Sequence, residues 1–193
     1  MHLLDCSFLV EYAMKSPGIS LRTQQEMSNL ANAYKVSEIL TNSNLTLFYL
    51  NSLIMDRPEP GESLKTALAW TDLNVSNKII LDHTQLKKFY DNKSINYDPL
   101  LTGKQGSFIL NFSLQLNENE QKEWNIIIDT NKSQSEINDL LTFLNQRTIV
   151  SNHIKKDIQE NHMKLDTLVA SADGSQVTNH QINDLHHTSN VLF

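Results

Sequence analysis

The sequence predicts a mainly helical α+β fold, in which long N- and C-terminal helices pair as an antiparallel coiled coil around a small mixed α/β insert. Three observations lead to this prediction. A heptad pattern of apolar residues runs through the C-terminal third, a second helical pattern covers residues 20–56, and a proline-containing segment followed by alternating apolar residues lies between them.

The C-terminal pattern repeats apolar residues at alternating spacings of three and four. These spacings average 3.5 residues, so the side chains fall on one seam of an underwound helix, and such a seam is buried only against a partner helix. The predicted helix-pairing positions are Ile137, Leu140, Leu144, Ile154, Ile158, Leu165 and Leu168.

Three polar residues, Arg147, Ser151 and Asn161, interrupt this seam. Polar side chains at core heptad positions specify register and partner at a cost in stability. Two readings stay open: the three residues specify an assembly interface, or the seam is covered only at its ends and they cross an exposed stretch.

The N-terminal segment, residues 1–19, ends in the turn Ser16–Gly18, after which Ser20 is placed to cap a helix from about Leu21 to Asp56. The apolar stripe of this helix changes phase near Ala33, which predicts either a kink or two consecutive helices. Residues 20–56 are the expected partner of the seam.

The insert, residues 57–117, begins at Arg57–Glu62, where two prolines end the helix. A short helix over Ser63–Trp70, a strand over Lys78–Leu81 and a helix from Asp82 to Tyr90 are expected next. The clearest strand signal is the alternation of apolar and polar residues within Gly106–Leu116.

Gly103–Gly106 is a plausible hairpin turn before that strand, so a β-hairpin or a sheet of two or three strands is expected. Asn117, followed by Glu120, predicts the N-cap of the C-terminal helical region, residues 118–172. The polar stretch Thr130–Ser135 could break this region, so that the long helix begins at Ser135. The tail, residues 173–193, is polar and is expected to be flexible.

Composition narrows the classes of function. With 22 acidic and 16 basic residues the net charge is −6, and the lysines and arginines form no cluster, which argues against a nucleic-acid partner. Cys6 is the single cysteine and is expected to be a buried small hydrophobe rather than a reactive thiol. No apolar stretch is long enough to span a membrane, and the N-terminus does not resemble a classical signal peptide.

Motifs for catalysis are missing from the sequence. It contains neither a nucleophile elbow nor a glycine-rich phosphate loop, so we predict no catalytic and no cofactor-binding residues. The spacing of the histidines argues against a metal site, because none forms the pair at i and i+4 that binds a metal from one helical face. The five in the last quarter are expected to be exposed: His153, His162, His180, His186 and His187.

From Gly106 to about Leu168, about a third of the chain, the order of features resembles the C-terminal part of the needle-tip proteins, or hydrophilic translocators, of bacterial type III secretion systems. In that family a glycine leads into an apolar strand, an acidic link leads to a tryptophan, and a long helix carries spaced leucines, a glutamine followed by a base, and an asparagine. The matching residues here are Gly106–Asn111, Leu116–Asn125, Leu141–Arg147 and Asn152.

The resemblance implies a secreted, non-enzymatic structural protein, exported without a cleavable signal, that caps or extends a needle and contacts needle or translocator subunits or further copies of itself. The chain is short for a tip protein and closer in size to the filament-forming subunits of the same systems. Two alternatives have a different character: a cytosolic helical adaptor or chaperone that binds a partner helix, and an injected effector without a recognisable catalytic motif.

Overall fold

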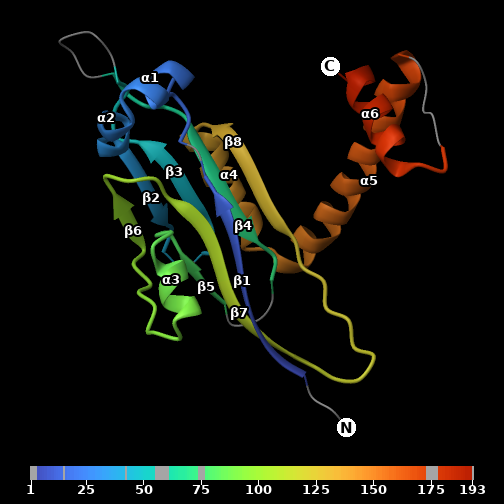
Figure 1. Ribbon diagram of the computed structural model, residues 1–193, viewed down its shortest axis with the longest axis horizontal. Helices are drawn as coiled ribbons and strands as arrows, with labels where there is room; N and C mark the ends of the chain where they lie inside the picture. The colour runs from blue at the N-terminus through green and yellow to red at the C-terminus, as the bar shows by residue number, and fades with distance from the viewer. Residues whose placement is uncertain are drawn as a thin grey trace. The chain divides into compact units, whose positions relative to one another are not determined.

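The computed structural model describes residues 4–14, 16–41, 43–54, 61–73, 77–172 and 178–192. The chain divides into two compact units, Met1–Phe143 and Leu144–Phe193, and each is described here by itself. Of the residues that the structure describes, 38% are helical and 28% lie in strands. Figure 1 shows these elements.

Two antiparallel sheets form the first unit. The three-stranded sheet has the order β1-β7-β5, and β1 and β7 pair along ten residues, from Leu4 opposite Leu116 to Ala13 opposite Ser107. The five-stranded sheet has the order β6-β2-β3-β4-β8. The strands are β1 Leu4–Ala13, β2 Lys35–Ile39, β3 Thr46–Leu50, β4 Thr66–Thr71, β5 Asn77–Ile80, β6 Leu100–Thr102, β7 Ser107–Leu116 and β8 Ile126–Lys132.

The two sheets enclose one apolar core. Strand β7 contributes Phe108, Leu110, Phe112 and Leu114 to this core, and the five-stranded sheet contributes Phe48, Ala67, Ala69 and Leu101. Trp124 packs on the edge of this core, with its ring 5.1 Å from that of Phe112 in a T-shaped arrangement. Burial of these side chains on both sheets makes the first unit a β-sandwich.

Four helices belong mainly to the first unit: α1 Leu21–Glu26, α2 Ser28–Ala33, α3 Gln85–Tyr90 and α4 Gln134–Leu144. A second apolar cluster, formed by Ile19, Ala31 and Leu50, attaches α2 to strand β3. Helix α4 follows β8 directly and buries Ile137.

The start of α4 is fixed by a capping box. The backbone N–H and the hydroxyl of Ser133 both donate to Glu136, at 2.8 and 2.7 Å. These two hydrogen bonds, with smaller effects of the Lys132 and Lys65 charges, lower the pKa of Glu136 from 4.5 to about 2, although desolvation acts in the opposite direction.

Two helices, α5 Arg147–Ala172 and α6 Gln181–Leu192, make up the described part of the second unit, and they contact each other. None of the helices in the described ranges is long and apolar enough to cross a membrane.

The predicted antiparallel coiled coil is wrong. Residues 21–39 form α1, α2 and strand β2, and β3 follows at Thr46, so the described part of residues 20–56 contains no long helix with which the seam could pair. The phase change near Ala33 marks the point where helix gives way to strand. Val36, Ile39, Phe48 and Tyr49 are β-branched or aromatic, which favours strands once a sheet can form.

Three local predictions are also wrong. Ser63–Trp70 was expected to be helical, but Thr66–Thr71 is strand β4. Gly103–Gly106 is not a hairpin turn, because β6 pairs with β2 while β7 pairs with β1 and β5. Asn117 and Glu120 do hydrogen-bond, at 2.8–2.9 Å, but they close a turn that leads to strand β8 instead of a helix.

Other local predictions are confirmed. Strand β7, strand β5 and helix α3 lie within one to three residues of the expected positions, and α4 begins at Gln134, next to the expected start at Ser135. One expectation differs: the tail, residues 173–193, was expected to be flexible, but its described part contains helix α6, Gln181–Leu192. The expected helix end at Gly174 lies outside the described residues.

Candidate functional site

The second unit presents apolar side chains to solvent. Six large ones have exposed fractions of 42–67%, whereas Val150 and Val169 are the buried apolar residues in the described part of this unit. The six are Ile158, Met163, Leu165, Leu168, Ile182 and Leu185. A pair of helices with more apolar surface outside than inside is typical of an interaction surface.

On α5 the exposed apolar residues form a stripe. Ile158, Leu165 and Leu168 follow the heptad phase, with Ile154 half-buried in the same stripe and Asn161 exposed in its middle. We call these five residues the α5 seam. Residues spaced in this way lie on one side of a helix, so the seam is a continuous strip of surface.

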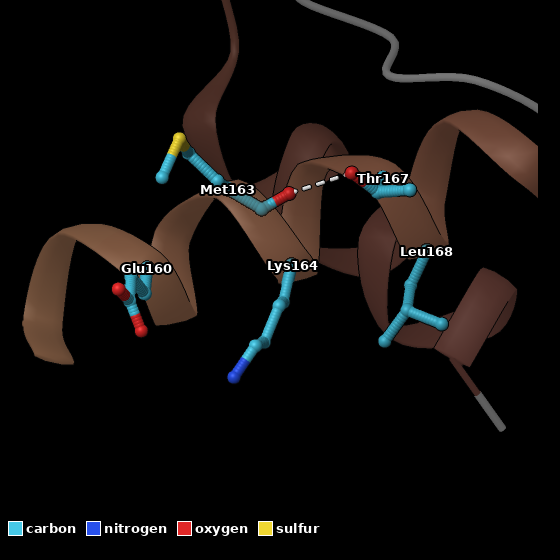
Figure 2. Close-up of a pocket in the computed structure, with 5 residues that line it drawn as sticks. All are labelled: Glu160, Met163, Lys164, Thr167 and Leu168. Carbon is cyan, nitrogen blue, oxygen red and sulfur yellow. Dashed lines mark hydrogen bonds between the residues drawn. The ribbon is translucent and has the colours of Figure 1, made fainter.

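A shallow hollow of about 550 Å³ lies beside this strip and is lined by Glu160, Met163, Lys164, Thr167 and Leu168 (Figure 2). Glu160, Lys164 and Leu168 point to the same side of the helix, and the Thr167 hydroxyl donates to the carbonyl of Met163 at 2.8 Å. The hollow thus combines an apolar floor with one charge of each sign.

Ion pairs on α5 run along the helix. Lys156 lies 3.4 Å from Glu160, and His153 lies 3.8 Å from Asp157. Lys164 forms no ion pair within the described ranges of the chain.

The structure distributes the predicted seam over two helices. Ile137, Leu140 and Leu144 lie on α4, where Ile137 is buried and the other two are half-buried, while the remaining four lie on α5. Of the three polar seam positions, Arg147 and Ser151 lie in the first turns of α5, and the structure does not describe their side chains. Asn161 is exposed between Ile158 and Leu165.

The histidines do not gather into a site. His153, His162, His180 and His186 are exposed and His187 is half-buried, and no three His, Cys, Asp or Glu side chains in the described ranges are placed to hold a metal ion. Cys6 lies on β1 opposite Leu114 in the strand pairing, and its side chain is not described.

A small polar pocket lies in the sandwich beside the start of α3. It has a volume of about 150 Å³ and includes Asp82, Asp98 and Lys104 in its lining. Burial alone would raise the pKa of Asp82, but hydrogen bonds from Lys104, at 2.6 Å, and Thr84 lower it overall. Because these groups already satisfy one another, the pocket is a weaker candidate than the α5 seam.

Lys35 is a buried residue whose role the sequence did not reveal. Only 2% of it is exposed, and its ammonium group donates to the side-chain oxygens of Gln24, Asn32 and Gln105 at 3.2, 2.9 and 2.5 Å. These bonds join α1, α2 and the β6–β7 connection to strand β2. A single lysine in a polar stretch gives no sequence signal for such a centre.

No protein-family model matches this sequence, and no curated protein matches it at a significant level. The functional interpretation therefore depends on the geometry of the two units.

Proposed function

We propose that this protein is a non-enzymatic assembly protein whose β-sandwich carries a helical unit that docks on protein partners. The exposed apolar surface of α5 and α6 is the observation that supports the proposal. Removing apolar surface from water contributes about 25 cal/mol per Å², so a strip of half-exposed Ile and Leu side chains is a source of binding free energy.

The helical unit also has the chemistry of a recognition surface rather than of a reaction centre. Its charged groups lie on a convex helix beside apolar side chains, and the hollow next to the seam is shallow. Apolar residues at helical spacing bordered by charges are the usual means by which helices select other helices.

The narrower proposal is that the protein is a needle-tip or filament subunit of a type III secretion apparatus, which assists the translocation of effectors into host cells. It rests on the resemblance over residues 106–168, and it loses the paired-helix stalk because the residues described within 20–56 form no long helix. A cytosolic adaptor or chaperone that binds a partner helix is the alternative that the same apolar surface favours.

Photo-crosslinking in the native cells tests the docking surface. A benzoylphenylalanine placed at Leu168, which is 59% exposed, is compared with the same group at Tyr90 on α3, an exposed aromatic position of the sandwich. We expect discrete protein adducts from position 168 that Ile158→Lys abolishes. Equal labelling from both positions would count against the docking surface.

Secretion is a separate question with its own assay. An epitope-tagged chain is followed in the culture medium of the native bacterium and of a strain lacking the ATPase of its type III system. Appearance in the medium only with the active ATPase supports the narrower proposal, whereas retention in both strains contradicts it and favours the adaptor.

A further inference from the structure

The α5 seam is nearly palindromic. Ile158 lies three residues before Asn161 and Leu165 four residues after it, while Ile154 and Leu168 lie seven residues to either side. The sequence of apolar positions is therefore almost the same in both directions along the helix.

A palindromic seam matches itself when two copies of the helix run antiparallel. In that arrangement Ile158 of one copy meets Leu165 of the other, Ile154 meets Leu168, and Asn161 lies beside its own counterpart at the two-fold axis. Contacts of this reciprocal kind define an isologous interface, in which one surface patch serves both subunits.

Charges beside the seam have the same symmetry. Asp157 lies four residues before Asn161 and Lys164 three residues after it, so both flank the same side of the seam. Antiparallel pairing places Asp157 of each copy next to Lys164 of the other, which gives two opposite-charge contacts. Asp157 is 57% exposed, and its His153 neighbour at 3.8 Å is an ion pair only when the imidazole is protonated.

We propose that the occupant of the α5 seam is the α5 helix of a second copy of this chain, in an antiparallel arrangement centred on Asn161. This inference rests on the proposed function and names its partner. In this register the amide of Asn161 lies beside its counterpart and can hydrogen-bond to it, whereas a shifted register would leave both amides against apolar side chains.

The exposures agree with this arrangement. With α6 already in contact with α5, Ile158, Leu165 and Leu168 still have exposed fractions of 45%, 42% and 59%. From Ile154 to Leu168 the helix rises about 21 Å at 1.5 Å per residue. A contact of this length is small for a protein interface, so a weak dimer that depends on concentration is expected.

Charge reversal tests the pairing on the full-length chain. Sedimentation equilibrium over a wide concentration range gives the dimer dissociation constant of the wild type, D157K, K164D and the double variant. Each single change turns both opposite-charge contacts into repulsions and is expected to raise the dissociation constant by about tenfold. The double change restores both contacts with the signs exchanged, so its constant should return to within about threefold of the wild-type value.

Apolar substitutions test the seam itself. Leu165→Lys is expected to leave the chain monomeric at every concentration, whereas Gln159→Lys, at an exposed position on the other side of α5, should leave the dimer unchanged. Circular dichroism confirms that both variants keep their helices, so that a loss of dimer is not a loss of folding.

Three results would overturn the self-pairing: a monomeric wild type, a double charge variant no better than either single variant, or dimerisation that survives Leu165→Lys. If the wild type is monomeric but position 168 still forms seam-dependent adducts with a different protein, the self-pairing is wrong and the proposed docking function stands. If neither association occurs, both are wrong.

Discussion

Replacing Gly106 by alanine tests a close contact between the two sheets of the sandwich. Gly106 immediately precedes strand β7, and its carbonyl accepts a hydrogen bond from Met14 at 3.4 Å. A Cβ at this position would clash with the hydroxyl of Ser37, lie 2.8 Å from the Ser37 Cβ, and lie 3.2 Å from the ring of Phe48.

The magnitude follows from these distances. Carbon atoms in contact prefer about 3.5–4.0 Å, so the new methyl group must displace Ser37 by about 1 Å. Both Ser37 and Phe48 are 1% exposed, so neither can move into solvent. Overpacking of this kind costs about 1–3 kcal/mol, and the lower entropy of the unfolded alanine chain offsets about 0.4–1 kcal/mol of it. We expect a net loss of about 1–2 kcal/mol.

Urea unfolding followed by tryptophan fluorescence measures this loss, because Trp70 and Trp124 both belong to the first unit. The matched background is Ser37→Gly, which removes both the hydroxyl and the Cβ that the new methyl group meets. In that background Gly106→Ala should cost less than about 0.5 kcal/mol, since the contact with Phe48 alone remains. If the glycine substitution costs the same in both backgrounds, the close approach of the two sheets here is not as described.

Three further predictions concern stability. Lys35→Met removes the donor from three side-chain oxygens and should lower the free energy of unfolding by about 1–3 kcal/mol in the same urea assay. The pKa of Glu136 in the folded protein, about 2, lies below its ordinary value of 4.5, so the stabilisation that its carboxylate gives the fold is complete above pH 4.5 and is lost as the pH falls toward 2. The difference in free energy of unfolding between wild type and Glu136→Gln should therefore shrink between pH 4.5 and 2. A difference that stays constant over this range would contradict the Ser133 cap. Phe108→Ala, at a fully buried position, should cost about 3–5 kcal/mol, whereas Ile158→Asp on exposed α5 should cost about 1 kcal/mol or less in thermal unfolding of the monomer.

The strand that the sequence predicts most clearly is β7, because its alternation is long. Phe108, Leu110, Phe112 and Leu114 alternate with polar residues, except at Ile109, and a helix cannot put all four on one side. By contrast, β2 and β3 are five residues each, and Val36, Leu40, Leu47 and Leu50 also fit helical spacing. A short apolar run fits the helical period and the strand period equally well, so pairing with neighbouring strands decides that these residues form strands.

The α5 seam, too, could be predicted only in part from the sequence. The heptad pattern identified Ile158, Leu165 and Leu168 as one strip of α5, and the structure places them so. The heptad spacing did not reveal that the helix is interrupted at Asn145 and Gln146, between the end of α4 and the start of α5. Periodicity specifies which side chains share a face, but it contains no information about which surface will cover that face.

Separation of the two units explains why the site and the fold respond to different substitutions. The sandwich encloses its own core, in which residues such as Phe108 and Leu110 are fully buried, whereas the α5 seam is exposed and belongs to the other unit. Substitutions at the seam therefore change association without removing core contacts of the sandwich. A variant such as Leu165→Lys should keep the urea midpoint of the sandwich while abolishing association, and a simultaneous loss of both would show that the seam contributes to the fold instead.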